Sequence, residues 1–230
     1  MARARNDIRN VAIIGAGISG LAASIRLAVR GKQVDVFEKS SSVGGKMGMF
    51  RMDGFRFDTG PSLFTWPQLL HALFRDAGRD LEDYIPYRRL SIITRYFYPD
   101  RTVIDAHARA EDFAEELARK AGEPPRNVLR YLAESEELFA LTRPVFLEES
   151  ISLRKALTPA YLRAYPRLHR LKAWQSLHDH HRKAFISDKT IQLFDRYATY
   201  NGSDPFRAPA TLRVIAHLEH NQGAFFPEEG

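Results

Sequence analysis

Three glycines lie between two apolar stretches near the start of the chain, in the order Gly15-Ala16-Gly17-Ile18-Ser19-Gly20. Gly15 permits a tight turn, Gly17 lets the backbone approach a pyrophosphate, and Gly20 lets a helix pack closely on a strand. The pyrophosphate would lie at the positive N-terminus of a helix over 18–30, which Gly31 ends. This spacing is typical of a site that binds a dinucleotide.

The elements on either side of the glycines fit the same prediction. Residues 11–14 are all apolar, as expected of a strand that is buried on both faces. Residues 34–37 form the second strand, and Glu38 closes it where a carboxylate can accept hydrogen bonds from ribose hydroxyls and repel a 2′-phosphate. A glycine-rich turn alone often has only a structural role. Strand, glycines, helix, strand and acid in this order favour the nucleotide site.

A second glycine cluster follows at Gly44-Gly45-Lys46, where a loop can return over the bound nucleotide. The paired glycines would let the backbone come close, and Lys46 would supply positive charge to a phosphate. An ordinary surface turn is the alternative. Asp53-Gly54 then predicts a hairpin, and Gly60-Pro61-Ser62 predicts a loop with a fixed bend.

The dinucleotide pattern stops after a predicted helix from residue 66 to residue 77. Residues 90–98 and 102–104 are rich in β-branched and aromatic residues, which predicts a hairpin in a second sheet. Two amphipathic helices are predicted over 109–121 and 125–142. In the second of these we expect five side chains to face inward: Val128, Leu129, Leu132, Leu138 and Leu141.

The composition sets outer limits on the protein. With 230 residues and 44% hydrophobic residues, the chain can form a core in one or two domains. It has no cysteine, which excludes disulfides and thiolate chemistry. It contains no run of 18 apolar residues and no apolar stretch within residues 1–10, so we expect a cytoplasmic protein without a membrane span or a secretory signal.

The positive charge is concentrated in residues 151–187. This segment carries eight lysines and arginines against one aspartate, while the whole chain has a net charge of +6. Leucines, with Tyr161 and Ala164, recur in it at steps of three and four residues. Pro159 and Pro166 break it into short helices, and Trp174 adds an amphipathic ring. A membrane-binding surface and a helical subdomain with a solvated basic face are both consistent with this pattern.

Two further kinds of site are not favoured by the sequence. His178-Asp179-His180-His181 places two histidines on one helix face, but no third ligand stands at a recognisable spacing, so we interpret it as a solvated helix without a metal. No nucleic-acid-binding module accompanies the basic segment, so we expect no nucleic-acid partner. No residue stands out as a catalytic base.

Taken together, the motifs resemble the N-terminal half of the bacterial-type phytoene desaturases, a flavin-dependent family of carotenoid desaturases within the amine-oxidase-like superfamily. The glycine motif with Glu38 is common to many flavoproteins. The residues that narrow the resemblance are Val43-Gly44-Gly45-Lys46, Phe55-Arg56-Phe57-Asp58-Thr59-Gly60-Pro61-Ser62, the stretch 196–206, and Ala224-Phe225-Phe226-Pro227.

The resemblance implies an α/β fold, with an incomplete Rossmann-like FAD-binding domain and an α+β domain for substrate and membrane. The implied parts are an FAD-binding part over 1–88, a substrate and membrane domain over 89–205, and a segment over 206–230 that returns to the FAD domain. The implied FAD contacts are Gly15, Ala16, Gly17, Ser19, Gly20, Glu38, Lys39, Gly44, Gly45, Lys46, Gly60, Pro61 and Ser62.

The implied reaction is hydride transfer from a C40 polyene to the flavin, with loss of a neighbouring proton and reoxidation by a quinone or oxygen. The implied location is the membrane surface, bound peripherally through 151–187.

The chain departs from the family pattern at its end, where Glu229 replaces an expected small residue. A doubly wound sheet needs about five or six strands, and only two are clear here, so we expect a truncated product with an exposed apolar edge. Another flavin oxidoreductase, such as an amine or porphyrinogen oxidase, and an inactive membrane-binding fragment are the alternatives.

Overall fold

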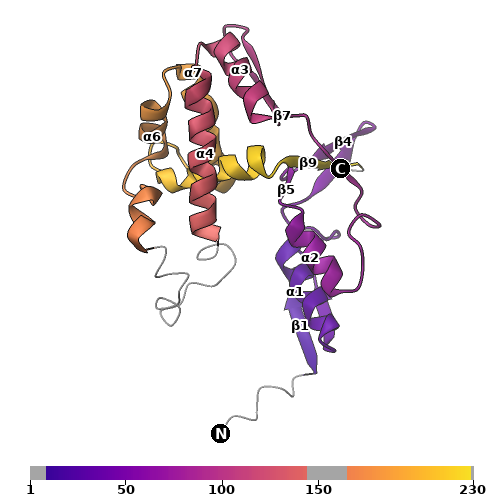
Figure 1. Cartoon of the computed structure of the whole chain (residues 1–230). Helices are drawn as coiled ribbons and strands as arrows, with labels where there is room; N and C mark the ends of the chain where they lie inside the picture. The colour runs from indigo at the N-terminus through magenta and orange to yellow at the C-terminus, as the bar shows by residue number, and fades with distance from the viewer. Residues whose placement is uncertain (1–8, 144–164, 229–230) are drawn as a thin grey trace. The chain divides into compact units, whose positions relative to one another are not determined.

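The structure is a computed structural model that describes residues 9–143 and 165–228. It divides into two compact units, coloured along the chain in Figure 1: unit 1 comprises Met1–Arg89 with Phe225–Gly230, and unit 2 comprises Leu90–Ala224. In this division the end of the chain, from Phe225, belongs to unit 1. Residues 151–164 of the basic segment and Glu229 lie outside the described residues.

Unit 1 begins with the predicted strand–helix–strand motif. Strand β1 (Asn10–Ile14) pairs in parallel with β2 (Gln33–Phe37), and helix α1 (Ile18–Val29) connects them. Helix α2 (Gln68–Asp76) lies beside α1 (Figure 1). These bounds agree with the sequence predictions to within one or two residues, because the apolar pattern and the turn glycines act locally.

Two further sheets complete unit 1. Strands β3 (Met49–Met52) and β4 (Phe55–Asp58) form an antiparallel hairpin around Asp53 and Gly54, which both have positive φ angles, of 51° and 81°. Two positive φ angles define the type I′ turn that this dipeptide favours. A three-stranded sheet has the order β5 (Phe64–Thr65), β9 (Ala224–Pro227) and β6 (Tyr87–Arg89), so the end of the described chain pairs within unit 1.

Unit 2 combines one hairpin with a group of helices. Strands β7 (Ile92–Phe97) and β8 (Val103–His107) pair in antiparallel, next to α3 (Ala110–Ala121). Helix α3 has acidic residues in its first turn and basic residues in its last, which complements the helix dipole, and Gly122 ends it in the left-handed conformation. Helix α4 (Pro125–Thr142) packs against α3 and begins with a proline in its first turn.

Shorter helices, formed by residues 165–221, complete unit 2. They are η3 (Tyr165–Leu171), α6 (Leu177–Ala184), α7 (Asp188–Asp195), η4 (Arg196–Asn201), η5 (Ala210–Arg213), α8 (Val214–Ala216) and the π-helical turn η6 (His217–Asn221). Three of them (η3, α8 and η6) contact α4. The apolar core of unit 2 includes Phe113, Leu117, Val128, Leu132 and Phe194, all fully or nearly fully buried. Among the described residues, no helix is both long enough and apolar enough to cross a bilayer.

Two burial predictions are wrong. Residues 11–14 do not form a strand buried on both faces: Ile14 is 92% exposed, and Phe37 on the paired strand is 59% exposed. Within the described residues β1 pairs only with β2, and α1 is the helix that packs against this short sheet. Leu129 is also exposed rather than inward, because the buried face of α4 follows Val128, Tyr131 and Leu132 instead.

Candidate nucleotide-binding site

The first glycine motif forms a tight turn at the carboxyl end of β1. Gly15 has a φ of +96°, and its amide donates a hydrogen bond of 2.7 Å to the carbonyl oxygen of Phe37 at the end of β2. A Cβ atom on Gly20 would overlap the carbonyl oxygen of Gly15. Helix α1 therefore passes so close to the turn that only glycine fits at position 20.

The N-terminus of α1 points its free amides at this turn. Gly17 is the N-cap residue, no side chain caps the helix, and the first turn contains no acidic residue. The first amides of a helix have no partner within the helix, so they and the helix dipole favour an anion at this position. A pyrophosphate is such an anion.

Glu38 lies at the end of β2, where the backbone holds its carboxylate. The amide of Ala16 donates to Oε2 at 2.8 Å, and the amide of Ser40 donates to Oε1 at 2.9 Å. These hydrogen bonds, with that of Ser40 contributing most, lower the pKa of Glu38 below its usual value. The group is therefore an ionised acceptor with lone pairs left for a ribose hydroxyl.

The second glycine cluster returns over the first. The amide of Gly44 donates to the carbonyl oxygen of Ala16 at 2.9 Å, and Gly17 and Gly44 form an isolated parallel bridge. Gly45 has a φ of +62°, and a Cβ atom on it would come within 3.1 Å of the Cα atom of Gly17. The loop therefore lies against the first glycine turn, and its contact with a nucleotide stays a prediction.

The third predicted loop packs against the second. A Cβ atom on Gly60 would overlap the carbonyl oxygen of Lys46, and the amide of Thr59 donates to the carbonyl oxygen of Gly48 at 2.8 Å. The structure thus brings three separate sequence motifs together within unit 1. Of the other predicted contacts, Ser19, Lys39, Lys46, Pro61 and Ser62 are exposed, whereas Ala16 is buried.

A cavity of about 530 Å³ opens beside these loops, entirely within unit 1. Its lining is mostly apolar, and it includes Ile18 at the start of α1 as well as the third loop. Arg51, Arg56 and Asp58 also line the cavity, and Arg56 forms an ion pair of 3.2 Å with Asp58. The sequence did not single out Arg51 and Arg56 as site residues, because alternating charged residues are normal on an exposed hairpin.

The histidine-rich helix in unit 2 is not solvated, which corrects the sequence interpretation. His181 is fully buried, and Asp195 on α7 accepts hydrogen bonds from His178 at 2.7 Å and from His181 at 2.6 Å. The other ring nitrogen of His181 is 2.8 Å from the hydroxyl of Tyr131 on α4. Burial lowers the pKa of His181 although Asp195 opposes the shift. The group links three helices, and the described residues contain no cluster suited to a metal ion.

The stretch 196–206, which carries part of the family resemblance, contributes Arg196 to a partly buried ion pair. Arg196 donates two hydrogen bonds to Glu219, at 2.7 Å and 3.0 Å, and its Nε donates to the Tyr96 hydroxyl at 2.7 Å. The rings of Tyr96, Tyr197 and Tyr200 surround the guanidinium at 5.0–5.7 Å. This part of the motif therefore stabilises unit 2. Its partner Glu219 lies outside the motif, and no spacing signal identified it.

The turn, the uncapped helix and the amide-held carboxylate define a dinucleotide-binding domain of the Rossmann-like class, which takes a flavin or an NAD(P) cofactor. Residues 13–77 match the family described as NAD(P)-binding Rossmann-like domain. Solved structures agree on the fold: the chain is similar to an oxidoreductase from Methanosarcina mazei (TM-score 0.53, 18% identity) and to a putrescine oxidase mutant (TM-score 0.54, 17% identity). The two matches include 96% and 95% of this chain, and 46% and 45% of the respective solved structures.

Curated relatives are similar to the chain at higher sequence identity. The chain is 38% identical to a 1-hydroxycarotenoid 3,4-desaturase of Flavobacterium sp. (strain P99-3), over 97% of the chain and 46% of that protein. It is 32% identical to a 4,4'-diapolycopene oxygenase of Methylomonas sp, over 98% of the chain and 45% of that protein. The chain is thus similar to carotenoid desaturases and oxygenases along almost its whole length, and it spans about half the length of these relatives.

Proposed function

We propose that the protein is an FAD-dependent oxidoreductase that desaturates a carotenoid, removing hydrogen from a CH–CH unit of a C40 polyene during carotenoid biosynthesis. The observation that carries the proposal is the convergence of the three glycine loops with Glu38 in unit 1. The desaturase named among its relatives acts on a hydroxycarotenoid, which supports a substrate of this class.

The residues of unit 1 fit a flavin dinucleotide. We propose that the amides at the start of α1 bind its pyrophosphate, that Glu38 binds its adenosine ribose, and that Gly44, Gly45 and Gly60 let the loops approach it. When bound, the flavin supplies a hydride acceptor. The full proposed set is Gly15, Ala16, Gly17, Ser19, Gly20, Glu38, Lys39, Gly44, Gly45, Lys46, Gly60, Pro61 and Ser62.

The cavity of unit 1 provides the surroundings for the reaction. Met47, Met49 and Leu63 give it an apolar wall, which suits contact with a polyene. Arg51 and Arg56 place positive charge in the same wall, and we propose that they stabilise the negative charge of a reduced cofactor.

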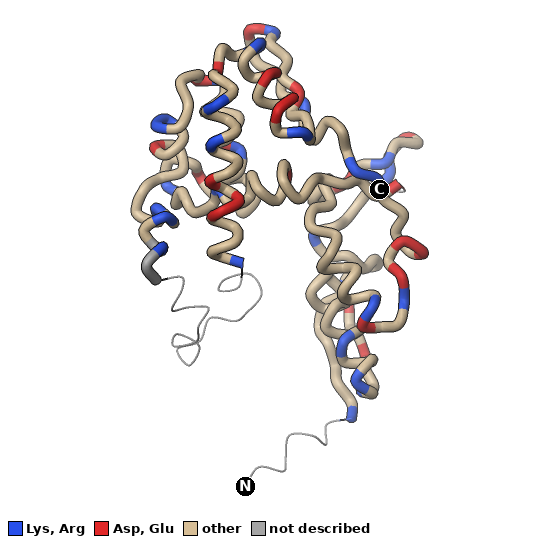
Figure 2. Tube along the Cα trace, in the orientation of Figure 1, with Lys and Arg blue, Asp and Glu red and all other residues tan. Residues whose placement is uncertain are grey.

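We further propose peripheral association with the cytoplasmic face of a membrane, where a polyene dissolves, and reoxidation by a quinone or oxygen. The described part of the basic segment supports a surface role. Trp174 is 76% exposed, and Figure 2 marks the lysines and arginines along η3 and α6, which include Arg167, Arg182 and Lys183. Exposed cations with an aromatic ring are typical of interfacial segments.

The test measures cofactor and substrate in one preparation. Cofactor released from the purified protein is identified by chromatography, and FAD affinity is measured for Glu38→Gln and for the exposed control Glu82→Gln. We expect FAD, with about tenfold weaker binding for Glu38→Gln because a charged hydrogen bond is lost. Turnover of a hydroxylated polyene in liposomes, without turnover of amines, is expected. Bound NAD(P) without flavin, or turnover of amines alone, would overturn the proposal.

A further inference from the structure

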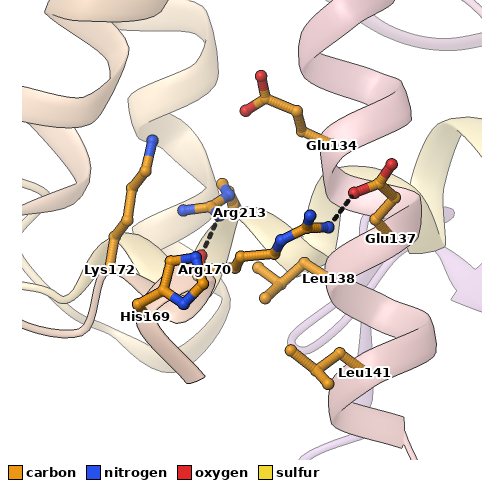
Figure 3. Close-up of a pocket in the computed structure, with 8 residues that line it drawn as sticks. All are labelled: Glu134, Glu137, Leu138, Leu141, His169, Arg170, Lys172 and Arg213. Atoms are coloured by element: carbon orange, nitrogen blue, oxygen red, sulfur yellow. Dashed lines mark hydrogen bonds and ion pairs between the residues drawn. The ribbon is translucent and has the colours of Figure 1, made fainter. Parts of the chain in front are cut away.

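Unit 2 contains a second cavity, of about 360 Å³, which the proposed function does not use. One wall is α4, which contributes Glu134, Glu137 and two leucines (Figure 3). The opposite side carries basic groups: Arg170 at the end of η3, Lys172 just after it, and Arg213 at the end of η5. Three cations around one cavity repel each other unless an anion is close.

Arg213 is the most informative of these groups. Its side chain lines the cavity although the residue is only 3% exposed, and its Nη2 donates to the carbonyl oxygen of Arg170 at 2.5 Å. Its Nε is buried and has no hydrogen-bond acceptor among the described residues. Its Nη1 makes only a long hydrogen bond of 3.5 Å, to the carbonyl oxygen of Ala210. A guanidinium that lines a cavity with donors incompletely satisfied favours a ligand that accepts hydrogen bonds.

Lys172 brings a second cation to the same side of the cavity, as Figure 3 shows. Its backbone has a φ of +49°, which is uncommon for lysine, and its Nζ lies 3.4 Å from Nδ1 of His180. Burial, and then the charge of Arg213, lower the pKa of Lys172 below its usual value. The two cations are therefore close enough to repel each other, and an anion bound between them would reduce this repulsion.

The acidic residues of the cavity do not neutralise this pair directly. Glu137 is engaged by Arg170 in an exposed ion pair of 2.8 Å. Glu134 lies near enough to influence the charges of both Lys172 and Arg213, but no ion pair within 4 Å joins it to either in the described structure. The negative charge of Glu134 repels an anion, so the anionic group of a ligand must bind on the side of the cavity away from α4.

We propose that Arg213 and Lys172 form a site for a phosphate group. Arginine supplies a planar set of donors and lysine a point charge, which together suit the tetrahedral acceptors of a phosphate. Leu138 and Leu141 on the facing wall would contact an organic part attached to it. The phosphate belongs to a lipid headgroup or to a free phosphate compound, and the site needs neither the flavin nor the reaction of unit 1.

The experiment uses the 230-residue protein and titrates it with inorganic phosphate by calorimetry at low salt. Lys172→Gln is compared with Lys120→Gln, which removes the same charge from the exposed end of α3. We expect about fivefold to tenfold weaker binding for Lys172→Gln and a change below about twofold for Lys120→Gln. Glu134→Gln should bind about threefold more tightly because it removes a repelling charge. This gain cannot arise from a loss of fold.

A second arm measures sedimentation with phosphatidylcholine vesicles, with and without phosphatidic acid. If Lys172→Gln alone reduces binding to the acidic vesicles, the phosphate belongs to a lipid headgroup. If inorganic phosphate binding depends on Lys172 while vesicle binding does not, the ligand is a free phosphate compound, and the site stands even where the membrane proposal fails. Absence of saturable phosphate binding, or equal losses in Lys172→Gln and Lys120→Gln, would overturn the proposal.

Discussion

At the scale of single residues, Gly20 is the position with the least tolerance in unit 1. Any side chain there meets the backbone carbonyl of Gly15, which cannot move without opening the turn between β1 and α1. We expect Gly20→Ala to cost about 1–3 kcal/mol in unfolding free energy, and to lower FAD affinity because the helix start shifts away from the pyrophosphate. Denaturant unfolding and flavin fluorescence quenching measure the two effects.

The control for this prediction adds one heavy atom elsewhere on the same helix. Ala23 is exposed, so Ala23→Ser should change both quantities little. If Gly20→Ala bound FAD as tightly as the unchanged protein, the close packing of α1 on the turn would have no part in nucleotide binding.

Residue types at fixed spacing were sufficient to predict the turn between β1 and α1 and the position of Glu38, because each of these features depends on backbone conformation within about 25 residues of sequence. The role of Asp195 could not be predicted in this way. It binds His178 and His181 from the next helix along the chain, and an aspartate near the end of a helix has no distinctive pattern. Arg213 was missed for the same reason: its burial depends on how η5 packs in three dimensions.

At the scale of elements, Asp195 joins α7 to α6, and through His181 to Tyr131 on α4. Asp195→Ala leaves two histidines without their acceptor, and each buried donor left unpaired costs about 1–3 kcal/mol, so we expect it to lower the unfolding free energy of unit 2 by about 3 kcal/mol. Asp195→Asn retains one acceptor oxygen and should cost less. Urea unfolding followed by tyrosine and tryptophan fluorescence gives both values.

Asp179→Asn provides a comparison on the same helix, because Asp179 is exposed. Its effect should stay within about 0.5 kcal/mol. Equal costs for Asp179→Asn and Asp195→Ala would show that the linkage between the three helices adds nothing to stability.

The helices of unit 2 also enclose two histidines that are held neutral. Burial, with Arg213 and Lys172 nearby, lowers the pKa of His180 to about 3, and burial lowers the pKa of His220 to about 4. His220 stacks on Phe113 and lies 3.1 Å from the Tyr197 hydroxyl. Since the unfolded chain binds these protons near pH 6.5 and the folded chain does not, stability is complete above about pH 6.5 and decreases as the pH falls toward 4.

We therefore expect unit 2 to lose about 2 kcal/mol per buried histidine between pH 7.5 and pH 5. His220→Gln should be less stable at pH 7.5 but should show a smaller decrease over this interval. His169→Gln, at an exposed position, is the control and should follow the unchanged protein. Identical pH dependence in all three proteins would contradict a neutral, buried His220.

Helices and hairpins that follow from a local sequence pattern could be predicted, but the elements that pack against them could not. The hairpin at Asp53-Gly54 and the helices over 109–121 and 125–142 follow from turn chemistry and helical periodicity, and the structure confirms them. Periodicity could not tell that α6 is covered by α7, so the charged sequence His178-Asp179-His180-His181 indicated a solvated helix. Burial is a property of neighbouring elements, which a single segment does not encode.

At the scale of the whole molecule, the two units differ in how well they cover their apolar residues. The core of unit 2 is closed by helices on both sides of α4, whereas the short parallel sheet of unit 1 leaves Ile14, Val36 and Phe37 exposed. Parallel sheets are normally covered on both faces, and two strands alone are marginally stable. An exposed apolar face of this kind favours contact with other apolar surfaces.

We expect the 230-residue chain to bind a hydrophobic dye and to self-associate at micromolar concentration, because its apolar strands also offer an unpaired edge. Ile14→Ser combined with Phe37→Ser should reduce both dye fluorescence and the apparent mass in sedimentation velocity. Ile186→Ser removes an exposed isoleucine from unit 2 and should leave both unchanged, since a single apolar side chain is normal on a surface. A monomer at all concentrations, or equal effects of the two sets of changes, would mean that the exposed face of β1 and β2 does not drive association.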